Sequence, residues 1–247
     1  MKTTYQAITL CTLLAASSAA QATVFSYDFD AGLGSDFTAF GATAHNGGGY
    51  GSNPTPHMDL SPNTVGTGSF FLNQQVDASI FSASFDFVAG GGSGADGLTF
   101  AWVTAPGLGS GGSGLGFSGF TGYAVAFDTY PVGNNINVLQ NDWTNVISPS
   151  AAASFEDTNW HHVDIDFNQG TLSVFLDSVL MLNTTLAGYN GFDAHFGFTG
   201  ATGGLTNYHK IDNFTLSTPA AAAQVPEPGT IALVGLALLG LARRYRR

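Results

Sequence analysis

The 247-residue sequence predicts an all-β protein in which two antiparallel sheets pack into a sandwich. In the middle of the chain, apolar side chains recur at every second position, a pattern typical of strands with one buried face. The same region is rich in Gly, Thr, Ser, Asn and Phe and has no convincing helical spacing. Two packed antiparallel sheets are the commonest arrangement for so many strands.

The N-terminus has the features of a secretory signal peptide. Lys2 supplies a positive charge, residues 7–16 are apolar, and Ala20-Gln21-Ala22 has the small-x-small pattern that signal peptidase needs. We predict a signal peptide over residues 1–22 and cleavage after Ala22. A buried N-terminal helix is the alternative, which the run of small residues after Leu14 disfavours.

The predicted strands follow from the apolar pattern. Alternation predicts half-buried strands over residues 25–29, 81–87, 163–167 and 172–176, and continuous apolar runs predict central strands over 98–103 and 123–127. Asn168-Gln169-Gly170 predicts a hairpin turn. The Gly-rich segments 47–49, 90–94 and 107–116 are predicted loops. None is followed by a lysine or a helix, so none has the pattern of a phosphate-binding loop.

A linker over residues 218–225 leads to a C-terminal tail over 226–247. The tail contains Pro226-Glu227-Pro228, a predicted apolar helix over residues 230–242, and a basic end over 243–247. The helix is short for a membrane span, and its arginines favour a cytoplasmic C-terminus. The tail resembles the PEP-CTERM sorting signal of Gram-negative bacteria. That resemblance implies a transient inner-membrane anchor, removal by an exosortase-type protease, and release at the cell surface of a bacterium that makes exopolysaccharide.

The region between the two ends, residues 23–217, is strongly acidic. Of the 6 Lys and Arg residues it keeps only Lys210, whereas of the 17 Asp and Glu residues it loses only Glu227. This charge disfavours binding to nucleic acid or to an anionic membrane. The one cysteine, Cys11, lies in the signal peptide, so the mature domain has no disulfide.

Six segments of this region resemble the L-type lectins, and they follow one another in the order of that family. They are residues 68–71, 81–87, 95–100, 111–117, 125–130 and 195–205. The resemblance implies a concanavalin-like two-sheet antiparallel β-sandwich, or jelly roll, over residues 23–217. It also implies a carbohydrate-binding protein that is not an enzyme.

The resemblance implies a sugar site around Asp96. A carboxylate accepts hydrogen bonds from two sugar hydroxyls, and charge-assisted bonds are the strong ones. The family pattern implies a cis Ala95–Asp96 peptide that aims this carboxylate. Backbone N–H groups at Gly112 or Gly114 would approach the sugar without a side chain in the way. The remaining members of the implied site are Tyr130 as an aromatic contact, Asn134, and the rim residues Gly203, Gly204 and Leu205.

The calcium site of the family is matched in part. The implied ligands are Asp128, the Tyr130 carbonyl and Asn134, with Asp142 as a further candidate. Ala126 stands where the family has a glutamate, and Val132 where it has an asparagine, so that Asn134 or Asn135 would serve in a shifted loop. Because Ca²⁺ takes six to eight oxygen ligands, both one calcium ion and none remain open.

Two other functions are weighed against sugar binding. A structural matrix protein on the same fold is favoured by the departures at Ala126 and Val132. A glycoside hydrolase needs two carboxylates, yet Glu156 is the single glutamate of the domain and Asp164 and Asp166 fit a solvated strand face. The sequence therefore predicts an exported glycan-binding protein of the cell surface or exopolysaccharide matrix.

Overall fold

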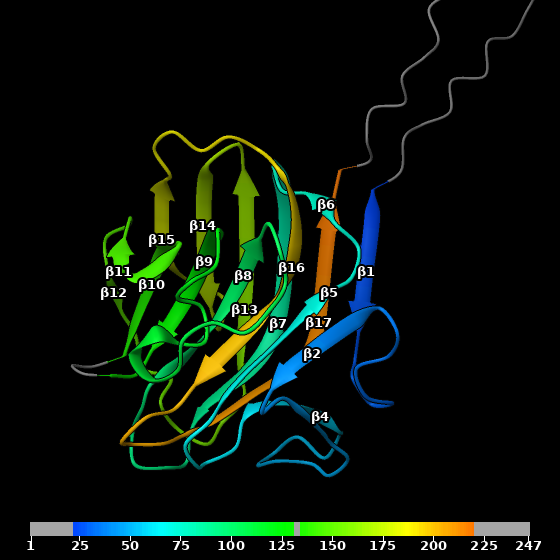
Figure 1. The fold of residues 1–247 in the computed structure, drawn as a ribbon, viewed down its shortest axis with the longest axis vertical. Helices are drawn as coiled ribbons and strands as arrows, with labels where there is room; N and C mark the ends of the chain where they lie inside the picture. The colour runs from blue at the N-terminus through cyan, green and yellow to red at the C-terminus, as the bar shows by residue number, and fades with distance from the viewer. Residues whose placement is uncertain (1–21, 131–133, 220–247) are drawn as a thin grey trace, which may run out of the picture. The chain divides into compact units, whose positions relative to one another are not determined.

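Two antiparallel sheets form a sandwich in this computed structural model, which describes residues 22–130 and 134–219 (Figure 1). The described chain forms one compact unit from Ala22 to Pro219. The predicted all-β sandwich is thereby confirmed. The strand boundaries below are those of the structure.

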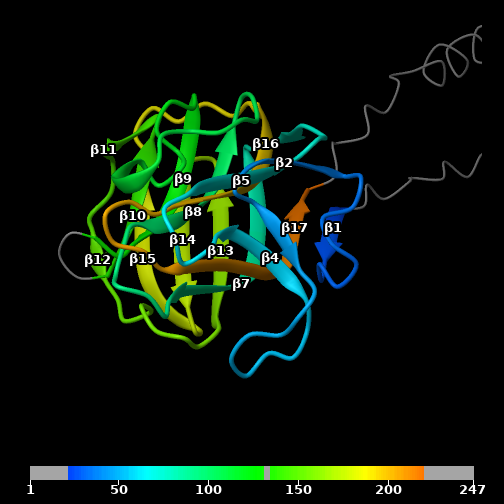
Figure 2. The same ribbon diagram turned by 60° about the horizontal axis from the view of Figure 1, so that its bottom comes forward.

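The eight-stranded sheet has β7 and β17 near its middle. In spatial order it contains β15 (Val179–Thr185), β14 (Thr171–Leu176), β13 (His161–Asn168), β7 (Ile80–Gly90), β17 (Tyr208–Thr218), β4 (His57–Ser61) and β3 (Ala44–Asn46). β1 (Thr23–Tyr27) also pairs with β17, and both views show these two strands side by side (Figures 1 and 2). The chain thus begins and ends its described part on neighbouring strands.

The nine-stranded sheet carries the segments that matter for function. Its order is β11 (Asp142–Val146), β10 (Asn135–Gln140), β9 (Gly122–Asp128), β8 (Gly97–Val103), β16 (Asp193–Ala201), β5 (Thr67–Leu72) and β2 (Phe37–Gly41). β12 (Ala151–Ala152) pairs with β10, and β6 (Val76–Asp77) pairs with β16. In Figure 1, β8, β16, β5 and β2 run obliquely across the strands of the other sheet.

Phenylalanine rings fill the space between the sheets. The inward residues of β7 contact rings of the facing sheet: Phe81 lies 4.9 Å from Phe196, Phe85 lies 4.9 Å from Phe198, and Phe87 lies 4.7 Å from Phe127, between ring centroids. All six side chains are buried. Burying an aromatic side chain contributes about 1.5–3 kcal/mol, so the period-two Phe pattern stabilises the sandwich directly.

A Gly-rich loop covers the outer face of the nine-stranded sheet. Leu115 and Phe117 from this loop pack in a second apolar cluster with Phe71, Ala126 and Leu139 from the strands beneath. The Leu115 carbonyl also accepts a hydrogen bond from the Thr199 hydroxyl, at 2.7 Å. The loop is therefore held against the sheet, and the glycines near its tip are brought to the strand ends.

Three local predictions need correction. Phe29 was predicted in the first strand, but β1 ends at Tyr27, because the Asp28 carboxylate accepts from the Asp30 N–H and Phe29 turns at a φ of 55°. The loop over residues 107–116 contains a short 3₁₀ helix, η1 (Gly112–Gly114). The last strand, β17, runs to Thr218, one residue past the predicted domain end.

The other strands are confirmed, as is the hairpin at Asn168-Gln169-Gly170, where Asn168 pairs with Thr171. The signal peptide, its cleavage at Ala22, the tail with Pro226, Glu227 and Pro228, and the helix over residues 230–242 lie wholly or partly outside the described residues. Within residues 22–130 and 134–219, no helix has the length and hydropathy needed to cross a membrane.

Candidate functional site

Four strand ends of the nine-stranded sheet meet where the sequence predicts the sugar site. Gly97 at the start of β8 pairs with Asp128 at the end of β9 and with Ala201 at the end of β16. Asp128 also pairs with Asn135 at the start of β10. The segments that precede or follow these residues are consequently neighbours, although they are up to about a hundred positions apart in the chain.

Asp96 occupies the centre of this region. The Ala95–Asp96 peptide bond is cis, as the family resemblance implied. Asp96 is held from both sides by its backbone: its N–H donates to the Ala201 carbonyl at 3.1 Å, and its carbonyl accepts from the Thr129 N–H at 2.9 Å. The side chain is only 5% exposed, and Oδ2 has no hydrogen-bond partner among the described residues. Burial raises the pKa of this carboxyl.

The glycines differ in how they relate to Asp96. A Cβ atom at Gly203 would lie 2.9 Å from Asp96 Oδ2 and 3.4 Å from the Gly112 Cα, so these three residues are in contact. Gly114 instead faces Ser110 and Ser118 inside the loop, and Gly204 has open space around it. Leu205 is 41% exposed, and its carbonyl accepts from the Gly203 N–H at 3.1 Å. Backbone therefore surrounds the free side of the carboxylate.

Asp128 adds a second carboxylate next to Asp96. Burial raises its pKa to about 6; the Tyr130 N–H, which donates to Oδ1 at 3.0 Å, opposes this shift, and the charge of Asp96 adds to it. Tyr130 itself is 43% exposed. The region thus offers two partly desolvated carboxylates and one accessible aromatic ring.

Asn134 is engaged away from these carboxylates. With its amide oriented to satisfy both partners, it donates to Glu156 Oε2 at 3.0 Å and accepts from the Glu156 N–H at 3.1 Å. The other carboxylate oxygen of Glu156 accepts from Asn207 Nδ2 at 3.0 Å. Glu156 thus joins the loop after Tyr130 to the loop after Leu205.

The described residues do not fit the calcium site implied by the family resemblance. Asp128 and the Tyr130 carbonyl remain as oxygen ligands, but the Asn134 amide is used by Glu156. The Asp142 carboxylate accepts from the N–H and hydroxyl of Thr144, at 2.9 and 2.8 Å. Among the described residues, no group of three or more His, Cys, Asp or Glu side chains could hold a metal ion.

A hollow of about 300 Å³ lies beside Asp128. Its wall is largely apolar, and its only other polar members are Asn137 and Thr144. The apolar wall consists of Leu115, Ala126, Leu139, Trp143 and Val146. Such a lining does not suit a hard cation that takes six to eight oxygen ligands.

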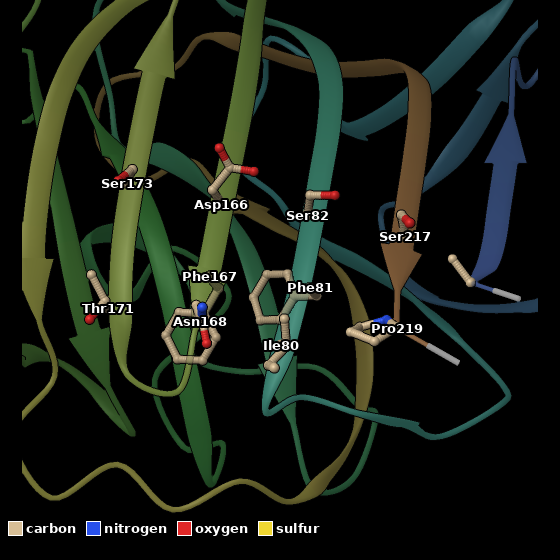
Figure 3. A pocket seen from close by; sticks show the side chains of 11 residues that line it. Ile80, Phe81, Ser82, Asp166, Phe167, Asn168, Thr171, Ser173, Ser217 and Pro219 are labelled. Atoms are coloured by element: carbon tan, nitrogen blue, oxygen red, sulfur yellow. The ribbon is translucent and has the colours of Figure 1, made fainter. Parts of the chain in front are cut away.

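Another hollow lies elsewhere, on the outward face of the eight-stranded sheet. This groove of about 510 Å³ runs over β7, β13, β14 and β17, and Figure 3 shows Ser82, Asp166, Ser173 and Ser217 along it. Its lining mixes short polar side chains with apolar ones such as Ile80 and Pro219, and none of its buried polar atoms lacks a hydrogen-bond partner. The buried, unpartnered oxygen of Asp96 therefore makes the region of Asp96 the better candidate for a ligand site.

Solved structures with the same fold are lectin domains. The exoplasmic/lumenal domain of VIP36 in its metal-free form matches with a TM-score of 0.65 and 18% identity, over 82% of this chain and 94% of that one. The carbohydrate recognition domain of Emp47p matches with a TM-score of 0.64 and 14% identity, over 79% and 95%. A lectin from Bauhinia forficata in complex with GalNAc matches with a TM-score of 0.61 and 17% identity, over 81% of this chain and 100% of that one. The predicted L-type lectin fold is thereby confirmed.

The C-terminus matches a protein-sorting model. Residues 224–247 match the family described as the PEP-CTERM protein-sorting motif, which confirms the resemblance of the tail. The motif indicates an exported protein that is anchored at the membrane before processing. A comparison with curated protein sequences found no match.

The sequence analysis did not predict that Glu156 and Asn207 lie at this site and bind each other. Glu156 was weighed only as a possible catalytic carboxylate, and Asn207 was not considered. Asn207 is 1% exposed, and its side-chain oxygen accepts from the Gly92 N–H at 3.1 Å. Being the only glutamate of the domain was the one signal available for Glu156.

Proposed function

We propose that the protein binds glycans at Asp96. The observation that carries this proposal is the buried, unpartnered Oδ2 of Asp96 in contact with Gly112 and Gly203. A buried carboxylate without a partner is unfavourable, so a ligand that donates hydrogen bonds to it is stabilised. Adjacent sugar hydroxyls are such donors, and the glycines leave room for a sugar ring to approach. Exposed Tyr130 and Leu205 offer apolar surface for the ring's less polar face.

The charge of the domain narrows the class of glycan. Its acidic composition, with Lys210 buried, repels anionic polymers. We therefore propose neutral glycans as ligands, at the cell surface or in the exopolysaccharide that surrounds the producing bacterium. The sorting tail supports this location, because its family resemblance implies removal by an exosortase-type protease at the membrane.

A glycan array tests the proposal with a matched pair of variants. Asp96→Ala should abolish binding, because a single-site affinity near 1 mM is only about −4 kcal/mol and a hydrogen bond to a charged group contributes about 1.5–3 kcal/mol. Asp166→Ala, on the far sheet, is the control and should bind like the parent. Unchanged melting temperatures would show that both variants are folded. Binding that survives Asp96→Ala would place the site elsewhere.

A structural matrix protein without sugar binding is the second candidate. The apolar packing of Ala126 and the use of Asn134 by Glu156 favour it, because both residues lie where the family holds its metal and its sugar contact. A parent protein that binds no glycan on the array, with and without calcium, would support this candidate. Incubation with β-glucans and assay of reducing ends tests the hydrolase alternative.

A further inference from the structure

Three loops meet beside Asp96, and one carboxylate lies between them. The first loop precedes Asp96 and includes Gly92 and Gly94, the second follows Asp128, and the third follows Ala201. Glu156 contacts the second loop through Asn134 and the third through Asn207. A Cβ atom at Gly94 would lie 2.9 Å from Glu156 Oε1, so the first loop also lies against this carboxylate.

Further hydrogen bonds connect these loops through the same residues. The Asn207 side chain, which donates to Glu156, accepts from the Gly92 N–H at 3.1 Å. The Thr206 carbonyl accepts from the N–H groups of Ser93 and Gly94, at 2.7 and 3.2 Å. The loop that carries Asp96 and the loop that carries Gly203 are thus joined at the position where Glu156 binds.

Glu156 is itself anchored by the core. Phe155 is fully buried, with its ring centroid 5.6 Å from that of Phe87 and 5.9 Å from that of Phe127. The Ala153 N–H donates to the Asn134 carbonyl at 2.9 Å, which ties the same segment to the second loop. Packing between the sheets therefore fixes the backbone at Phe155, next to the exposed Glu156.

We propose that Glu156 is the positioning residue of the glycan site and that it orders the surrounding loops without a calcium ion. The effect on glycan binding rests on the proposed function, whereas the contacts of Glu156 with the loops are independent of any glycan. In a calcium-dependent site, a bound ion would fix the loop after Asp128. Here the two carboxylate oxygens and the backbone N–H of Glu156 hold Asn134, at the end of that loop, and Asn207 in the neighbouring loop.

Hydrogen exchange in the exported protein tests the loop contacts directly. Glu156→Ala should speed amide exchange about tenfold or more at residues 92–97, 134–135 and 201–207, as expected when hydrogen bonds to a charged group are lost. Glu156→Gln should restore slow exchange only in part, because its one side-chain oxygen can accept from Asn207 or from Asn134 but not from both. Asp157→Ala is the control, since that carboxylate contacts Asn159 and His161 instead. Parent-like exchange in Glu156→Ala would overturn the proposal.

Calcium and a chelator provide the second measurement. Exchange in the three segments, and binding of the parent to a printed array of neutral glycans, should be the same in excess Ca²⁺ and in excess EDTA. Faster loop exchange or lost glycan binding in EDTA would overturn the inference. A parent that binds no glycan, but whose loops respond to the Glu156 variants as expected, would refute the proposed function alone.

Discussion

Gly203 lies directly against the carboxylate of Asp96: a Cβ atom at Gly203 would stand 2.9 Å from Asp96 Oδ2. This contact joins the start of β8 to the loop after β16, a hundred residues later. Because Gly203 has no side chain, the unpartnered Oδ2 of Asp96 has open space next to it. The first prediction uses this contact.

Gly203→Ala should weaken glycan binding by about tenfold or more, because a methyl group would either displace the carboxylate or exclude a sugar hydroxyl from it. Gly47→Ala, in the loop after β3, is the matched control, since no atom lies within 4 Å of the Cβ it would add. Isothermal titration with an array-positive glycan measures the difference. Equal affinities for the two variants would contradict the assignment of Asp96 Oδ2 as the hydroxyl acceptor.

Asp128→Asn should stabilise the protein at pH 7. Burial raises the pKa of Asp128 to about 6 in the folded state, against about 3.9 in the unfolded state. Above pH 6 the folded protein therefore bears a disfavoured charge, and this cost is relieved as the pH falls from about 6 to 4.

The expected gain for Asp128→Asn is about 1 kcal/mol at pH 7, after allowance for solvent screening, and it should vanish near pH 4. Urea denaturation at the two pH values measures it. Asp166→Asn, on an exposed strand face, should show no such pH-dependent gain. A variant that is less stable than the parent at pH 7 would mean that the Asp128 charge is compensated.

His209 should make the protein sensitive to mild acid. Its ring is buried, Nδ1 lies 2.7 Å from the Ser61 hydroxyl, and burial lowers its pKa to about 3. An unfolded histidine has a pKa of about 6.5, so between these values the proton binds only the unfolded chain. The neutral His209 ring makes its full contribution to the free energy of unfolding above pH 6.5. This contribution is lost as the pH falls towards 3, by up to about 1.4 kcal/mol per pH unit.

Denaturation of His209→Gln at pH 7, 6 and 5 isolates this effect. The variant should lose stability with falling pH less steeply than the parent, even if it is less stable at every pH. His45→Gln removes an exposed histidine and should keep the parent's slope. Identical slopes in all three proteins would assign the acid sensitivity to other groups.

Processing in the producing bacterium should remove both ends of the chain. Mass spectrometry of the mature protein should find an N-terminus at Thr23 and a C-terminus near Pro226. The sorting motif matched over residues 224–247 is the basis for the second cut. Detection of the terminal arginines in the mature protein would show that the tail is retained.

The sequence alone predicted most of the strands and the sorting motif at the C-terminus. Alternation in segments such as residues 81–87 reports burial of one face, which depends on neighbours two positions away. The Pro-Glu-Pro, apolar and basic parts of the tail are likewise contiguous. Local patterns of this kind can be predicted without the tertiary structure, because the residues concerned are neighbours in the sequence. The resemblance to the L-type lectins additionally predicted the cis Ala95–Asp96 bond and the position of Asp96.

Only the tertiary structure decided which side chains meet. Glu156, Asn134 and Asn207 carry no shared spacing, yet strand ends from β8, β9, β10 and β16 bring their loops together. Lys210, the one Lys or Arg of the domain, is similarly buried against Asp59, with its Nζ over the rings of Tyr50 and Tyr208. Contacts between residues far apart in sequence follow from sheet order and register, and two strands with the same alternation can pair in many ways until the whole core is packed.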